Sequence, residues 1–131
     1  MKSPFLVLHD AEVARIEAET TYTVYDDVPE GAAYPYVVMG EMTGRDWSDK
    51  FEPGQEVYST KHIWSQYKGR KEIVEMGDGI LQALTKSALD LAPNFRAVLQ
   101  ELDLDEVIID IDGITRHKIL RNRYLIEEVS T

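Results

Sequence analysis

The sequence contains no cysteine among its 131 residues. This absence excludes disulfide frameworks, thiolate zinc sites and cysteine nucleophiles, and it is compatible with assembly in a reducing cytoplasm. Internal repeats, low-complexity tracts and linkers long enough to separate two domains are also missing. With 44% hydrophobic residues, a chain of this length can bury a core without disulfides or a metal. We therefore expect one domain that spans residues 1–131.

A long apolar run is missing as well. The apolar patch Phe5–Leu8 near the start of the chain is followed closely by Asp10. A signal peptide needs a longer hydrophobic segment and a small-residue cleavage site, and a membrane helix needs roughly 20 apolar residues. We therefore expect a soluble protein that has no membrane partner and is not exported through a signal peptide.

Basic residues are few relative to acidic ones. The chain has 14 Lys and Arg against 24 Asp and Glu, which gives a formal net charge of −10. Neutralisation of phosphates by Lys and Arg supplies most nucleic-acid affinity, and no compact patch of basic and aromatic residues offsets the acid excess. This balance argues against specific binding to nucleic acid.

Catalytic and ligand-binding motifs are also lacking. No G-x-S-x-G, G-x-G-x-x-G or Walker sequence occurs, and "DIDG" at 110–113 offers too few oxygen ligands for a calcium loop. The three histidines, His9, His62 and His117, fall in different expected elements without metal-ligand spacing; we interpret His62 as a packed, hydrogen-bonded side chain. We expect no enzymatic activity, no cofactor and no metal. A small hydrolase with a site assembled from scattered residues remains an alternative.

The first half of the chain predicts one helix followed by strands. Ser3 as N-cap and Pro4 at the first helical position predict a helix that ends near Thr20, with an apolar stripe through Leu6, Val13 and Ile16. Further strands are expected at 21–25, 36–42 and 56–67, and a polar connection at 44–54. Alternation in the last strand places one set of side chains on each face: Tyr58, Thr60, His62 and Trp64 on one, and Val57, Ser59, Lys61 and Ile63 on the other.

In the segment 68–89 the apolar residues recur with a period of 3.6, whereas side chains alternate with a period of 2 in the strand before it. This spacing predicts the clearest helix of the chain. The expected buried stripe consists of Ile73, Gly77, Ile80, Leu84 and Ala88, and Pro93 marks the exit. Two glycines inside this helix, Gly77 and Gly79, cost about 1 kcal/mol each relative to alanine. They therefore suggest a tight contact between the helix and the sheet.

Residues 95–129 predict a long hairpin about 111–113, for which two registers compete. A two-residue loop places Glu106 opposite Ile119 and Asp103 opposite Asn122. A three-residue loop with Gly113 in the left-handed conformation instead pairs opposite charges: Glu106 with Lys118, Asp103 with Arg121 and Glu101 with Arg123. Each such pair contributes roughly 0.2–1 kcal/mol, so we favour the second register.

The order of elements predicts an α+β fold. We expect an antiparallel sheet of four to five strands with two helices packed on one face. Two groups of residues are candidates for contacts with other proteins. One is the segment "RDWSDKF", in which an aromatic residue stands among charges, as in many interfaces; its Trp47 could equally be a lid on the core. The candidates are Arg45, Asp46, Trp47, Lys50 and Phe51, and, on the last strand, Arg116, Lys118, Arg121 and Arg123.

Four segments carry a family resemblance: "VYDDVPEGAAYPYVVMGE" (24–41), "DWSDK" (46–50), "EVYSTKHIWSQYKGRKE" (56–72) and "DGITRHKILRNRYLIE" (112–127). In this order and spacing they resemble the tail-completion proteins of long-tailed bacteriophages and prophages, the head–tail joining or tail-terminator group. The likeness spans roughly residues 20 to 128, is strongest in the Val-Pro-Glu-Gly to Tyr-Pro-Tyr-Val-Val run, and is weakest in the first 18 residues.

The resemblance implies a structural protein with a fold like that of lambda-type tail terminators. It implies a hexameric ring that closes the tail tube, with the tube protein and the head connector as partners, in a virion assembled in the host cytoplasm. It supplies no catalytic residues. A head-completion adaptor, or another small morphogenesis protein, is the alternative.

Three observations agree with this interpretation. A ring needs two different contact patches on each subunit, and the hairpin carries acidic "ELDLDEVIIDID" followed by basic "TRHKILRNR". An acidic lumen would let DNA pass without the affinity that a basic one creates. Apolar residues on both faces of the last strand suggest that both faces become covered.

Overall fold

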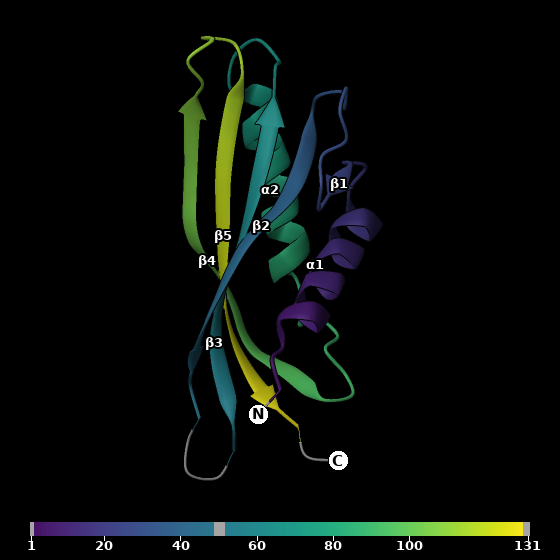
Figure 1. The fold of residues 1–131 in the computed structure, drawn as a ribbon, viewed down its shortest axis with the longest axis vertical. Coiled ribbons are helices and arrows are strands. Elements are labelled where there is room, and N and C mark those ends of the chain that lie inside the picture. Colours follow the sequence, from purple (N-terminus) through teal and green to yellow (C-terminus); the bar gives the residue numbers. More distant parts are fainter. Residues whose placement is uncertain (1, 49–51, 130–131) are drawn as a thin grey trace.

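The computed structural model describes residues 2–48 and 52–129. Its elements follow the order α1 (Phe5–Glu19), β1 (Val24–Tyr25), β2 (Tyr36–Asp46), β3 (Gly54–Ser65), α2 (Lys71–Thr85), β4 (Phe95–Ile109) and β5 (Arg116–Glu128). The strands form one sheet with the order β1-β2-β3-β5-β4. Both helices lie against one face of this elongated sheet (Figure 1). The predicted α+β class is confirmed, although the short β1 pairs in parallel with β2 and makes the sheet mixed.

Helix α1 starts one residue later than predicted, and of the predicted stripe only Ile16 is fully buried. Pro4 is the N-cap residue, and the Ser3 hydroxyl accepts a hydrogen bond from the Phe5 N–H at 3.3 Å. The buried positions are Leu8, Glu12 and Ile16, whereas Leu6 is 73% exposed. The prediction for Leu6 was wrong because a buried carboxylate occupies the middle of the stripe and breaks its apolar periodicity.

Helix α2 confirms the predicted helix, most of its predicted buried stripe and the predicted tight contact with the sheet. Ile73, Gly77, Ile80 and Leu84 are buried, whereas Ala88 lies beyond the helix and is exposed. A Cβ atom added at Gly77 would lie 2.1 Å from Cε of Lys118. The absence of a side chain at Gly77 therefore leaves room for the Lys118 side chain of β5 to pack against the helix.

Strand β2 continues to Asp46, four residues beyond the predicted end, because its pairing with β3 extends to Arg45 opposite Glu56 and Asp46 opposite Gln55. Arg45 and Asp46 are thus strand residues, and the connection between β2 and β3 is shorter than the predicted connection at 44–54. The alternation predicted for β3 is confirmed: Val57, Ser59, Lys61 and Ile63 are buried. They face the helices together with Leu120, Asn122 and Tyr124, their partners on β5.

The β4–β5 hairpin contains both registers that the sequence left in competition. Near the loop Glu106 lies opposite Ile119, and beyond a bulge at 102–104 Glu101 lies opposite Arg123. The predicted pairing of Glu106 with Lys118 was wrong, because Lys118 lies opposite Val107 and its Nζ contacts Asp105 at 2.6 Å. The loop matches neither expected length: the Asp110 N–H donates to the carbonyl of Thr115 at 2.8 Å. Gly113 has the expected left-handed conformation, with φ of 71°.

The core lies between the helices and the sheet. Its members are Leu8, Ile16, Val37, Val57, Ile63, Ile73, Met76, Ile80, Leu84, Leu89, Leu91, Ala97, Leu120, Tyr124 and Ile126. In the described part of the chain neither helix is long and apolar enough to span a membrane.

Candidate functional site

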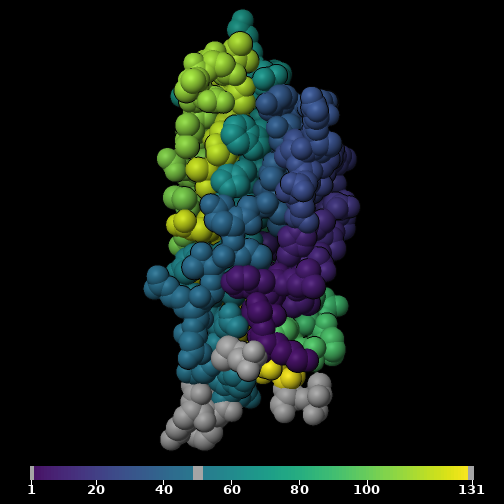
Figure 2. All heavy atoms as spheres, in the orientation of Figure 1, coloured from purple at the N-terminus to yellow at the C-terminus, as the bar shows by residue number. Residues whose placement is uncertain are grey.

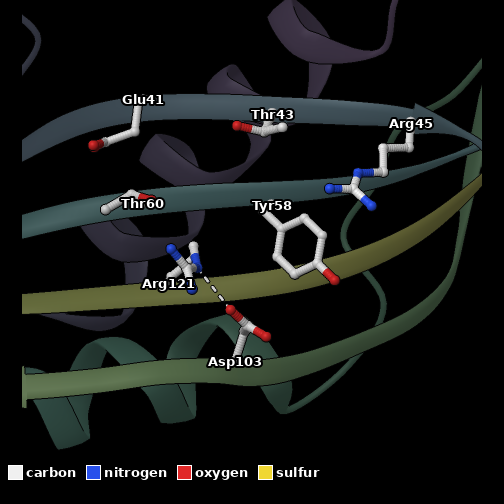
Figure 3. Close-up of a pocket in the computed structure, with 7 residues that line it drawn as sticks. All are labelled: Glu41, Thr43, Arg45, Tyr58, Thr60, Asp103 and Arg121. Atoms are coloured by element: carbon white, nitrogen blue, oxygen red, sulfur yellow. Dashed lines mark hydrogen bonds and ion pairs between the residues drawn. The ribbon is translucent and has the colours of Figure 1, made fainter.

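The face of the sheet opposite the helices, which we call the open face, carries several polar and aromatic side chains, among them Tyr58, His62 and Trp64 of β3 and Arg121 and Arg123 of β5. At its centre is a shallow depression of about 330 Å³, lined by Glu41, Thr43, Arg45, Tyr58, Thr60, Asp103 and Arg121. Figure 3 shows that β2, β3, β4 and β5 all contribute side chains to it. The alternation of β3 and β5 produces this arrangement, since every second residue points away from the helices.

Ion pairs between neighbouring strands cross the open face. Arg121 Nε lies 2.6 Å from Asp103 Oδ2. Arg123 lies between two carboxylates, 2.7 Å from Glu56 and 2.8 Å from Glu101. Hydrogen bonds to Glu56 and then to Glu101 raise the pKa of Arg123 above its usual range. These arginines therefore join β5 to the strands on its two sides.

Arg45 differs from the other arginines of the depression. Its exposed guanidinium has no ion-pair or hydrogen-bond partner within residues 2–48 and 52–129. In Figure 3 it lies at one end of the depression, beyond the ring of Tyr58. Arg45 is thus a cation on the open face that is available to another molecule.

Trp47 follows β2 and lies at the end of the molecule where β3 begins. The backbone N–H of Trp47 donates to the carbonyl of Gly54 at 2.8 Å. A Cβ atom added at Gly54 would lie 2.9 Å from the indole ring of Trp47. The side chain nevertheless remains 41% exposed. Asp46 accepts hydrogen bonds from the Ser48 hydroxyl and N–H, which lower its pKa. Trp47 is therefore held in place and still presents part of its ring.

The remaining predicted contact residues have different environments. Arg116 donates to the carbonyls of Gly113 and Ile114 at 3.3 and 2.8 Å, within the loop of its own hairpin. Lys118 is buried on the helix side, with its side chain 4% exposed. Lys50 and Phe51 lie outside the described residues. The described candidates thus divide into an exposed group around Arg45 and Trp47 and a group whose side chains are engaged within the sheet and its hairpin: Arg116, Lys118, Arg121 and Arg123.

A second cluster on the open face brings together residues that are far apart in the sequence. His62 Nδ1 lies 2.8 Å from His117 Nε2, and His62 Nε2 lies 2.9 Å from Glu41 Oε1. The ring of Trp64 stacks on His117 with centroids 3.9 Å apart. Burial, and then the neighbouring His62, lower the pKa of His117. The interpretation of His62 as a packed, hydrogen-bonded side chain is confirmed.

The sequence contained only half of the signal for this cluster. Alternation placed His62 and Trp64 on one face of a strand, but the pairing of β3 with β5 brings His117 beside them. Glu41 joins through the irregular register of β2 between Met39 and Met42. In the described residues no group of three His, Cys, Asp or Glu side chains could hold a metal ion.

Comparisons with known proteins agree on one family. A family model described as tail completion protein gp17 matches residues 6–127. The tail completion protein gp17 of Bacillus phage SPP1 is 33% identical over 93 residues, which cover 71% of this chain and 68% of the relative.

Two solved structures share the fold. A chain in the virion of a native gene transfer agent particle superimposes with a TM-score of 0.80 at 23% identity, covering 92% of this chain and 94% of that one. The structure of bacteriophage SPP1 gp17 gives a TM-score of 0.58 at 25% identity, with 95% and 89% covered. The family resemblance read from the sequence is confirmed: the chain belongs to the tail completion protein gp17 family of phage proteins.

Proposed function

We propose that this protein is a non-enzymatic subunit of a hexameric ring that closes the head-proximal end of the tail tube and joins it to the head connector. The observation that carries the proposal is the family match over residues 6–127, together with the relationship to a phage tail completion protein. The subunit acts in the virion at the junction of head and tail, after assembly in the host cytoplasm.

The open face and the end that carries Trp47 supply contact surfaces for such a subunit. Arg45 is an exposed cation without a partner in the described chain, and Trp47 presents a fixed, half-exposed ring. Trp and Arg are the residues that most often dominate binding energy in interfaces. We assign the tail-tube contact to Arg45, Asp46 and Trp47, with Lys50 and Phe51 next in the sequence, and the subunit contact to the part of the open face that carries Arg121 and Arg123.

The net charge of −10 supports passage of DNA through such a ring. A predominantly acidic lumen repels phosphates and avoids the counterion release that drives binding to basic surfaces. Specific nucleic-acid recognition has no part in the proposal.

Electron microscopy of lysates that lack this protein tests the proposal. The expected result is unjoined tails of abnormal length beside free, DNA-filled heads. Normal-length tails joined to heads in its absence would contradict it. Co-sedimentation of the purified protein with tailless heads, and not with tubes, would identify a head-completion adaptor instead.

A further inference from the structure

The tip of the β4–β5 hairpin exposes an unusual concentration of isoleucine. Ile108 is 40% exposed, Ile109 45%, Ile114 59% and Ile111 fully exposed, and Tyr67 on the adjacent β3–α2 loop is 52% exposed. Figures 1 and 2 show the hairpin loop and the β3–α2 loop together at one end of the molecule. Apolar side chains exposed together at one end of a molecule are typical of sites of protein–protein contact. We call these five residues the apolar tip.

The loop that carries the apolar tip is held in one conformation by its polar residues. The carboxylate of Asp112 accepts from the N–H groups of Ile114 and Thr115, both at 2.8 Å, and from the Thr115 hydroxyl at 2.7 Å. Gln66 donates to the Thr115 hydroxyl oxygen at 3.1 Å, which links the two loops. A loop that is already ordered loses less entropy when it binds. The isoleucines are therefore displayed by a preformed structure.

The charges around the apolar tip indicate the chemistry of its partner. Lys68, Arg70 and Lys71 are exposed and have no ion pair in the part of the chain that the structure describes. The loop acids Asp110 and Asp112 are exposed as well, but their carboxylates accept hydrogen bonds from the backbone N–H groups of Ile111 and Ile114. Unpaired cations therefore flank the apolar tip of a protein with a net charge of −10. An apolar groove with an acidic rim complements this end.

The position of the apolar tip separates it from the proposed tube contact. Along the long axis, the tip and the end of β2 that leads to Trp47 lie at opposite ends (Figure 1). Subunits that stand side by side with their long axes along the axis of a ring present their two ends to opposite sides of that ring. If Trp47 faces the tail tube, as proposed above, the apolar tip faces the head.

We propose that the apolar tip, with Lys68, Arg70 and Lys71, docks into an acid-rimmed apolar groove of the head-connector protein. This inference rests on the proposed function and adds to it the residues that contact the head. It also separates two steps: tube closure uses the Trp47 end, and joining to the head uses the tip.

An assembly experiment with the full chain tests this proposal. The double variant Ile111→Ser/Ile114→Ser replaces the two most exposed isoleucines, and Leu6→Ser is its control, because Leu6 is 73% exposed but distant from the tip. Each variant replaces the wild-type chain during tail assembly. Tail length is measured by electron microscopy, and purified tails are mixed with purified DNA-filled heads to count joined particles.

The double variant is expected to give tails of normal length and to reduce joining to heads about tenfold or more, as loss of central interface residues does. Leu6→Ser is expected to match the wild type in both measurements. The charge reversal Lys68→Glu/Arg70→Glu/Lys71→Glu is expected to reduce joining similarly, without a change in tail length.

Joining at the wild-type level by the tip variant would overturn the inference. So would tails of abnormal length from a variant that circular dichroism shows to be folded, because the apolar tip would then contact the tube or a second copy of the chain. Failure of the wild-type chain itself to set tail length or to join heads would overturn the proposed function instead.

Discussion

Glu12 and Lys61 form an ion pair with both side chains completely buried, and 2.8 Å separates Oε2 from Nζ. The other Glu12 oxygen accepts from the Ser59 hydroxyl at 2.5 Å, and Oε2 also accepts from the Tyr124 hydroxyl at 2.7 Å. Lys61 also donates to the Ser59 carbonyl. One carboxylate of α1 is thus bound to both β3 and β5. Burial lowers the pKa of Lys61, and the charge of Glu12 opposes this shift.

Removal of the Glu12 charge is expected to destabilise the fold strongly. The substitution Glu12→Gln leaves the Lys61 ammonium buried without a counter-charge, which typically costs about 3–5 kcal/mol. Urea unfolding followed by circular dichroism measures this loss. The control Glu17→Gln changes an exposed residue of the same helix and should alter the unfolding free energy by less than about 0.5 kcal/mol. Equal effects of the two substitutions would show that the buried pair is not maintained in solution.

The two glycines of α2 are expected to respond in opposite ways to alanine. Gly79→Ala should stabilise the protein by up to about 1 kcal/mol, through helix propensity, because its added Cβ meets Tyr22 at an ordinary 3.5 Å. Gly77→Ala should destabilise it, because the Cβ would lie 2.1 Å from Lys118 Cε and would displace that side chain from Asp105. Thermal unfolding of both variants provides the comparison.

A double-mutant cycle tests the cause assigned to Gly77. In the background Lys118→Ala, where the obstructing side chain is shortened, Gly77→Ala should become neutral or stabilising. A penalty that persists in this background would point to strain in the helix backbone.

Asp112 is expected to make the stability of the hairpin loop dependent on pH. Hydrogen bonds from the Thr115 side chain, the Thr115 N–H and the Ile114 N–H lower its pKa below the ordinary value of 3.8. A carboxylate with a lowered pKa stabilises the folded state fully above its unfolded pKa, and this contribution is lost as pH falls through the folded pKa. The stability of Asp112→Asn should therefore fall less steeply below about pH 4 than that of the wild type.

Chemical denaturation at a series of pH values between 2 and 6 measures the Asp112 effect. The matched control Asp27→Asn changes an exposed aspartate with no hydrogen bond or ion pair in the described part of the chain. Asp27→Asn should keep the wild-type acid dependence, and an identical profile for the two variants would contradict the prediction.

The proposed tube contact predicts that Trp47 acts in assembly more than in folding. Because 41% of the side chain is exposed, Trp47→Ala should reduce binding to purified tail tubes about tenfold or more. Arg45→Glu should do the same, because it reverses an unpaired exposed charge. Val28→Ala, at a residue that is 40% exposed elsewhere, is the control. Co-sedimentation with tubes measures binding, and wild-type binding by the Trp47 variant would remove this end of the molecule from the tube contact.

Much of the fold follows from patterns within short segments of the sequence. The stripe from Ile73 to Leu84 determined a helix because a period of 3.6 places those residues on one side. The alternation through Tyr58 and His62 determined the two faces of β3, because successive side chains of a strand point to opposite faces. Such patterns are readable because the spacing of side chains along a helix or strand depends only on local backbone geometry. The segments from 24 to 127 likewise carried enough family character to identify a tail completion protein.

Tertiary structure decided what depends on partners distant in the chain. Glu12 interrupts the apolar stripe of α1, and only Lys61 and Tyr124, on other elements, make its burial tolerable. His62 and His117 are neighbours because β3 pairs with β5, and the bulge at 102–104 combines two registers that the charges alone could not assign. The position of a bulge and the stability of a buried charge depend on contacts with residues of other strands and helices. Those contacts form only in the folded protein, so a short segment of sequence cannot reveal them.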